Sequence, residues 1–203
     1  MAIASYANPL VEQRDLLSGK AAVALDSKVI RVIGDDRLKW LHALLSQNIV
    51  NLLPGQSAEA LLLDPQGHIE ANLHIVDDGR ITWLIVEQTR AQLVFEHLNK
   101  MKLRTKVTIE LDGELQVFAT FGEPLPNANV VWLDPWPEVT PGGHRYAAKS
   151  GEVWSYVESI AESSSLGKAG TSALEALRVM AHRPSMEEVD DKTLPHELDW
   201  LAT

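Results

Sequence analysis

The chain has 203 residues, a formal net charge of −10 and 45% hydrophobic residues, which suffices for a packed core in one large domain or two small ones. Because an acidic chain repels phosphate backbones, we expect no direct nucleic-acid partner. The sequence contains no cysteine, no signal-peptide pattern and no long apolar run, so we expect a cytoplasmic protein without disulfides, thiolate metal sites or membrane contact.

The first half of the sequence predicts strands, two helices and tight turns. Six strands are expected, over residues 22–25, 29–33, 58–63, 69–76, 81–86 and 106–111. Helices are expected over residues 35–50 and 90–101, where apolar side chains recur every three or four positions. From residue 58 onward the order is β-β-β-α-β with tight hairpins. This order favours an α+β protein with antiparallel or mixed sheets and packed helices, and it argues against a doubly wound parallel sheet.

The second half predicts two strands, a long connection rich in Pro and Asn, and two helices. The strands are expected over residues 115–121 and 130–133. The first helix is expected to open at Ser150, and its apolar face would be formed by Val153, Tyr156, Val157 and Ile160. The second helix is expected over residues 173–182, and it ends before a proline.

The strand expected over residues 69–76 has the pattern of greatest chemical interest. Since side chains alternate between the two faces of a strand, one face carries polar residues, namely His68, Glu70, Asn72 and His74. Such a face suits solvent, the wall of a ligand cavity, or a metal ion held by the His and Glu side chains. No second cluster supplies the remaining ligands of a metal, so we expect no metal site.

Known catalytic motifs are not found in the sequence. There is no nucleophile elbow, no phosphate-binding loop and no dinucleotide fingerprint. Adjacent acids such as Asp77 and Asp78 fall in expected turns, where Asp side chains commonly accept hydrogen bonds from backbone N–H groups. Arg178 falls within an apolar helix pattern, where an Arg either reaches solvent or holds the carboxylate of a ligand. The residues by themselves predict an α+β protein with a polar-lined strand, and no reaction.

Three stretches of the chain carry a resemblance to a known family. They are residues 34–55 (GDDRLKWLH, SQN and PG), residues 63–79 (LDPQGH and NLHIVDDG), and residues 173–181 (ALEALRVMA) together with 194–201 (LPHELDWL). In this order they resemble the YgfZ-type folate-binding proteins. These are relatives of the glycine-cleavage T-protein, a tetrahydrofolate-dependent aminomethyltransferase.

The resemblance implies a ring of domains around a folate-binding channel, with tetrahydrofolate as the ligand. It also implies a role in assisting the assembly or repair of iron–sulfur clusters, with iron–sulfur proteins or assembly factors as partners and indirect effects on tRNA modification. The acid of the T-protein that takes part in catalysis falls on Asn72 here, so we expect no catalytic residue and a binding protein rather than an enzyme. Two alternatives stay open, namely an aminomethyltransferase of the T-protein class and a degenerate scaffold that binds proteins.

The resemblance further implies four ligand-binding residues. Asn72 stands on the polar strand, and Arg178 matches the Arg of the family's Leu-Arg helix. Gln47 stands where the T-protein has the Asn of a Thr-Asn-Asp sequence. Tyr146 matches the Tyr of a Tyr-Glu pair that grips the pterin, although the Glu is replaced by Ala147.

The resemblance also implies a domain organisation. Residues 1–51 and 113–203 are expected to form a discontinuous first domain, and residues 52–112 an inserted β-β-β-α-β domain. The family's Lys-Gly-Cys-Tyr-x-Gly-Gln-Glu signature and a third β-domain are absent from the sequence. We therefore expect Trp200 to be partly exposed or poorly ordered, and a channel around Asn72 to stand open.

Overall fold

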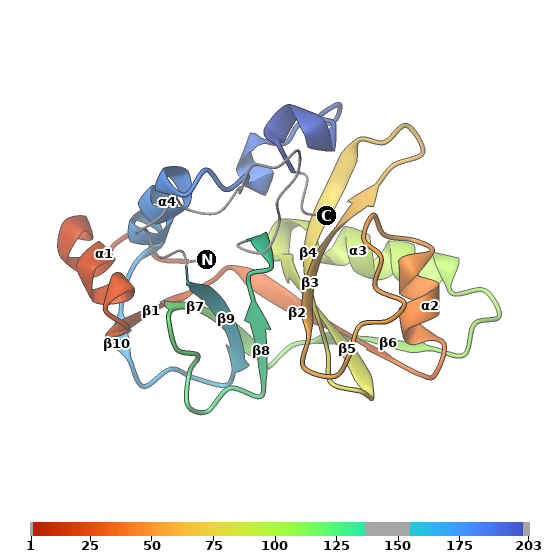
Figure 1. Cartoon of the computed structure of the whole chain (residues 1–203), viewed down its shortest axis with the longest axis horizontal. Coiled ribbons are helices and arrows are strands. Elements are labelled where there is room, and N and C mark those ends of the chain that lie inside the picture. The colour runs from red at the N-terminus through yellow and green to blue at the C-terminus, as the bar shows by residue number, and fades with distance from the viewer. Residues whose placement is uncertain (1, 137–154, 201–203) are drawn as a thin grey trace. The chain divides into compact units, whose positions relative to one another are not determined.

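The chain divides into two compact units (Figure 1). The structure is a computed structural model, and it describes residues 2–136 and 155–200. Unit 1 comprises Met1–Asp26 and Leu115–Pro184, and unit 2 comprises Ser27–Glu114 and Ser185–Thr203. These boundaries differ from those of the expected domains, because the strand that begins at Ser27 pairs within the sheet of unit 2.

Unit 1 is built on a mixed five-stranded sheet in the order β10-β1-β7-β9-β8. Its strands are β1 (Ala21–Ala24), β7 (Gln116–Phe121), β8 (Val130–Leu133), β9 (Tyr156–Ala161) and β10 (Gly167–Lys168). Strands β1 and β10 run parallel, and the other neighbours are antiparallel. Helices α1 (Pro9–Leu17) and α4 (Thr171–Met180) pack against each other and against β1. They bury Leu16, Phe121 and Leu177 in a shared core.

A buried carboxylate fastens the helices of unit 1 to the segments beside them. Glu12 of α1 is 4% exposed, and its Oε1 accepts hydrogen bonds from the backbone N–H groups of Tyr6 and Ala7. Its Oε2 accepts the N–H of Gly170, at 2.7 Å, immediately before α4. Burial on its own would raise the pKa of Glu12, but the hydrogen bonds from Gly170, Ala7, Tyr6 and Ser5 outweigh it and lower the pKa from its ordinary 4.5.

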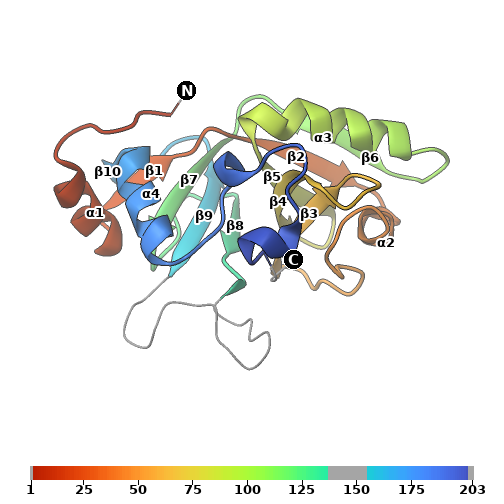
Figure 2. The ribbon, with the colours of Figure 1, turned by 90° about the horizontal axis from the view of Figure 1, so that it is seen from above.

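Unit 2 is built on an antiparallel five-stranded sheet in the order β3-β4-β5-β2-β6. Its strands are β2 (Ser27–Ile33), β3 (Ser57–Leu63), β4 (Ile69–Asp77), β5 (Ile81–Glu87) and β6 (Thr108–Asp112). Its helices are α2 (Arg37–His42) and α3 (Gln88–Met101), with short 3-10 turns at Met186–Glu188 and Pro195–Leu198. Helix α3 lies along one face of the sheet and covers the apolar core there (Figure 2).

The two sheets and packed helices confirm the expected α+β class, but several elements differ from expectation, among them the short strand β10, which was not expected. The expected helix with Tyr156, Val157 and Ile160 on its apolar face is wrong, because these residues form β9 between β7 and β8. The earlier positions of that helix, Ser150 and Val153, lie outside the described residues. Helix α2 ends at His42, so only the start of the expected helix over 35–50 is helical. Helix α1, which begins after the capping residue Asn8, was not expected.

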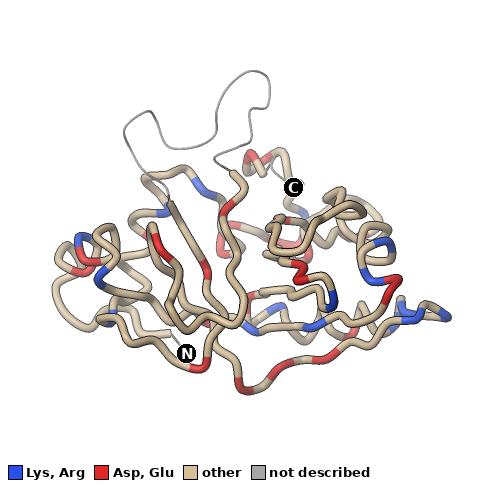
Figure 3. Tube along the Cα trace, turned by 60° about the horizontal axis from the view of Figure 1, so that its bottom comes forward, with Lys and Arg blue, Asp and Glu red and all other residues tan. Residues whose placement is uncertain are grey.

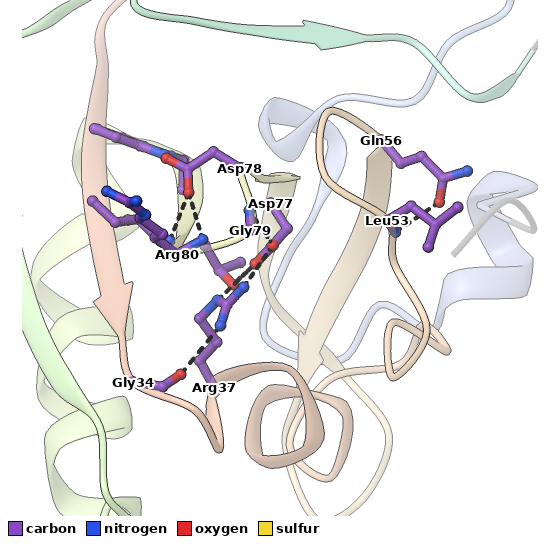
Figure 4. A network of polar contacts seen from close by, with 11 residues as sticks. Gly34, Arg37, Leu53, Gln56, Asp77, Asp78, Gly79 and Arg80 are labelled. Atoms are coloured by element: carbon purple, nitrogen blue, oxygen red, sulfur yellow. Dashed lines mark hydrogen bonds and ion pairs between the residues drawn. The ribbon is translucent and has the colours of Figure 1, made fainter.

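A polar network joins α2 to the β4–β5 hairpin (Figure 4). Arg37 donates to both carboxylate oxygens of Asp77, at 2.8 and 2.7 Å. Thr82 Oγ1 and the N–H of Gly79 donate to the same carboxylate, at 2.6 and 2.8 Å. The carboxylate of Asp78 accepts from the backbone amides that follow it in the turn. This pair of acids therefore stabilises a hairpin, which confirms the interpretation of the pair as turn residues.

We predict that Glu12→Gln destabilises the protein. A Gln side chain keeps one acceptor but places an NH₂ group among N–H donors, so the free energy of unfolding should fall by about 1–3 kcal/mol, measured by urea denaturation at neutral pH. Because the folded state lowers the pKa of Glu12, this stabilisation is present above its ordinary 4.5 and is lost as the pH falls through the folded-state value. The difference in the free energy of unfolding between Glu12→Gln and the unaltered protein should therefore become smaller as the pH falls below that value. Glu114→Gln, at an exposed position, is the matched control and should change little. Equal stability of Glu12→Gln and the unaltered protein at neutral pH would contradict the prediction.

Candidate functional site

Strand β4 has one apolar face and one polar face, as the sequence predicts. Its apolar side chains are buried in the core of unit 2, these being Ala71, Leu73 and Ile75. Glu70, Asn72 and His74 are half-buried on the opposite face. His68, just before the strand, is held by the carboxylate of Asp64, with His68 Nδ1 2.8 Å from Asp64 Oδ2. The candidate ligand-binding residues on the polar face are therefore those around Asn72 and His74.

A buried carboxylate on the neighbouring strand organises this face. Glu59 of β3 stands directly opposite His74 and is 4% exposed. Its Oε1 accepts hydrogen bonds from Asn72 Nδ2 and from Trp200 Nε1, each at 3.0 Å. His74 Nε2 lies 3.8 Å from the same oxygen and 3.3 Å from Asn72 Nδ2. These donors offset the cost of removing the carboxylate from water.

The hydrogen bond to Glu59 fixes the orientation of the Asn72 amide. Since the amide nitrogen donates to Glu59, the amide oxygen is the atom left to meet another partner. Within the part of the chain that the structure describes, Asn72 Oδ1 is buried and accepts no hydrogen bond. An unpaired buried acceptor costs about 1–3 kcal/mol, so a ligand that donates an N–H or O–H to this oxygen would recover that free energy. Asn72 Oδ1 is thus the neutral acceptor that a ligand reaching this face would contact.

Trp200 is buried, and the expectation that it is partly exposed or poorly ordered is wrong. Its side chain is 2% exposed and its indole N–H donates to Glu59. The same segment also meets β4 through its backbone, where the N–H of Ile69 donates to the carbonyl of Thr193 at 3.0 Å. Glu59 lies 141 positions from Trp200 along the chain, so no local pattern reveals the contact. The open channel around Asn72 stays a prediction.

Glu87 adds a second acid to this face of the sheet. It lies two positions after Ile85, which pairs with His74, so Glu87 and His74 point to the same side. Burial raises the pKa of the Glu87 carboxyl, and the negative charge of Glu187 raises it further, while Arg90 and His74 act in the opposite direction. A partly buried acid with a raised pKa is typical of ligand-binding and proton-transfer sites.

The other expected ligand-binding residues fall in different places. Gln47 is half-buried in unit 2, and its Oε1 accepts the backbone N–H of Asn48 at 2.8 Å. The preceding residue, Ser46, is tied to β3, because its Oγ accepts the N–H of Leu61 at 2.8 Å. Gln47 therefore belongs to the loop beside β3. Tyr146 lies outside the described residues.

Arg178 belongs to unit 1, where it is engaged by its own helix. Its Nε and Nη2 donate to the two carboxylate oxygens of Glu175, at 2.8 and 2.5 Å, and Nη1 donates to the carbonyl of Arg183. The hydrogen bond from Arg178 lowers the pKa of Glu175. These contacts stabilise the end of α4, and a role of Arg178 in ligand binding stays a prediction.

Sequence reasoning missed Glu59 and Glu87. A signal for Glu59 was present, because it is the single charged residue of the segment SAEALLL that forms β3. No group of three or more His, Asp or Glu residues among 2–136 and 155–200 is arranged to hold a metal ion. In the same residues, no helix has the length and apolar character needed to cross a membrane.

The comparisons with known proteins place this chain by its fold. No protein-family model matches it, and no curated protein matches it. Among solved structures, it is similar to the glycine cleavage system aminomethyltransferase T from Bartonella henselae, with a TM-score of 0.68 and 16% identity. The match covers 100% of this chain and 66% of that chain. The protein therefore has a T-protein-like α+β fold, and it spans about two thirds of the length of this neighbour.

We predict that Trp200 and Glu59 are energetically coupled. Trp200→Phe removes the indole donor from a buried carboxylate, so the free energy of unfolding should fall by about 1–3 kcal/mol. A double-mutant cycle with Glu59→Gln, followed by urea denaturation, should give a coupling energy of about 0.5–3 kcal/mol.

Trp83→Phe is the matched control for this cycle. The indole of Trp83 donates to Asp78 rather than to Glu59, so its cycle with Glu59→Gln should be additive. Additive behaviour of the Trp200 cycle as well would show that the observed hydrogen bond does not stabilise the fold.

Proposed function

We propose that this protein binds a folate-type molecule through the polar face of β4 and acts as an accessory protein of the YgfZ type. The observation that carries the proposal is the buried oxygen of Asn72, which no described residue meets, on a T-protein-like fold. The sequence resemblance to folate-binding proteins supplies the class of ligand.

The residues of the face fit a folate. The pterin ring of a folate carries an amino group and ring N–H groups, and these donors match a neutral acceptor such as Asn72 Oδ1. Glu59 holds the amide of Asn72 in the orientation that presents this oxygen, and Trp200 in turn helps hold Glu59. A bound folate would supply a carrier for one-carbon groups, and the residues named here bind and orient the ring.

The choice of a binding protein over an enzyme rests on the chemistry of the amide. Asn72 carries no charge and does not exchange a proton near neutral pH, so it cannot replace an ionised carboxylate in aminomethyl transfer. The proposed role in iron–sulfur cluster assembly or repair is supported by the sequence resemblance alone. Since these residues contain no cysteine, such a role would be exerted on clusters held by partner proteins.

Titration calorimetry with 5-formyltetrahydrofolate tests the proposal. We predict binding by the unaltered protein and a loss of affinity of about tenfold for Asn72→Ala, which removes the acceptor. Asn99→Ala, the same substitution at an exposed position of α3, is the matched control and should bind as the unaltered protein does. Thermal unfolding of each variant checks that the fold is kept. An absence of binding at millimolar ligand, or equal affinity of Asn72→Ala, would refute the folate site.

A second candidate function is tetrahydrofolate-dependent aminomethyl transfer. The observation in its favour is Glu59, because this buried carboxylate lies one hydrogen bond from Asn72 and restores an acid to the face. The test measures methylene-tetrahydrofolate formed from an aminomethyl donor. We expect no turnover by the unaltered protein. Turnover that Glu59→Gln reduces about a hundredfold would replace the first candidate by the second. If Asn72→Asp gains an activity that the unaltered protein lacks, the second candidate is wrong.

A further inference from the structure

Unit 2 carries a recess whose lining contains none of the polar residues of β4. It is an open hollow of about 710 Å³ between α2 and the connection from α3 to β6, and it is lined by Asp36, Lys39, Trp40, Leu103, Arg104 and Thr105. Its wall is fixed, because the indole N–H of Trp40 donates to the carbonyl of Met101 at 3.3 Å. The hollow therefore has an apolar part, formed by Trp40 and Leu103, and a part with two cations, Lys39 and Arg104, and one acid, Asp36.

The connection from α3 to β6 is strongly basic in an acidic protein. Residues 100–106 (KMKLRTK) contain Lys100, Lys102, Arg104 and Lys106 and no acid, although the chain carries a net charge of −10 (Figure 3). Helix α3 ends at Met101 and Lys102 is its C-cap, so the helix dipole accounts for Lys100 and Lys102 but not for Arg104 and Lys106. None of these four, nor Lys39, forms an ion pair with a residue in the described ranges 2–136 and 155–200.

An apolar side chain is displayed in the middle of these cations. Leu103 is 86% exposed, and its backbone has a φ of 45°, a left-handed conformation that a leucine adopts at a cost. A hydrogen bond from Thr105 N to the carbonyl of Lys102, at 2.9 Å, closes the turn around it. The turn would be more stable with glycine at this position, so stability does not explain the leucine.

We propose that this hollow is a docking site for an acidic segment of a partner protein, which places a large apolar side chain against Trp40 and Leu103. The unpaired cations select for acidic residues, and the apolar wall selects for an aliphatic or aromatic anchor between them. A short segment contacts the basic residues and little else. A nucleic acid or an anionic membrane would extend beyond the basic residues over other parts of a chain whose net charge is −10, and would be repelled there. This inference is independent of the proposed folate site.

Fluorescence anisotropy with a labelled synthetic peptide tests the docking site. The probe is a short peptide of Asp and Glu residues around a single leucine, and its binding should weaken as the ionic strength rises. The double variant Lys39→Glu with Arg104→Glu should lower the affinity about tenfold or more. The matched control, Lys20→Glu with Lys192→Glu, makes the same change in net charge at exposed positions outside the hollow and should retain binding.

The variant Leu103→Gly distinguishes an effect on peptide binding from an effect on stability. Glycine accepts the left-handed backbone, so this variant should unfold at an equal or higher urea concentration while its affinity for the peptide falls about tenfold. Three results would overturn the proposal: no binding of the peptide, an equal loss in the two charge-reversed variants, or retained affinity in Leu103→Gly. Tighter binding of phosphatidylserine vesicles or of duplex DNA than of the peptide would also overturn it. The affinity of the Lys39→Glu, Arg104→Glu variant for 5-formyltetrahydrofolate should be unchanged, so failure here and failure of the folate site are distinguishable.

Discussion

A carboxylate that is buried on folding needs hydrogen-bond donors to replace water. Glu59 is such a carboxylate, and the polar contacts of this face of unit 2 depend on it. One donor comes from Asn72 on the adjacent strand, and the other comes from Trp200 near the far end of the chain. A single oxygen atom therefore determines how the Asn72 amide is turned and what the segment before Trp200 packs against.

The parts of the fold that follow from local patterns could be predicted from the sequence. The alternation along β4, the hairpin turn at Asp77 and Asp78, and helix α3 each depend on residues only a few positions apart. Strand β9 could not be predicted in this way. Its apolar residues at spacings of three suit a helix as well as a strand buried on both faces, and its pairing with β7 decides between them.

The polar face of β4 could be predicted from the sequence, but the contacts that hold its side chains could not. The polar face and Asn72 follow from alternation and from the family resemblance, whereas the groups that position Asn72 come from another strand and from the end of the chain. The contacts of an Arg side chain likewise cannot be predicted from the sequence. Arg178 was expected to contact a ligand, and in the structure it is engaged by Glu175 and by the carbonyl of Arg183. The sequence pattern predicts the helix or strand to which a residue belongs, whereas its side-chain contacts depend on tertiary packing.

The discontinuity of unit 1 has a consequence for the order in which the protein assembles. The sheet of unit 2 is complete once Asp112 has been made, because all of its strands lie between Ser27 and Asp112. Strand β1 pairs only with β7 and β10 among the described strands, and Glu12 bonds Gly170, 158 positions later. During synthesis the sheet of unit 2 can therefore form first, before the partners of α1 and β1 and the segment that contains Trp200 have been made. Residues of α1 and β1 are therefore made before those of unit 2, but they gain their native partners after them.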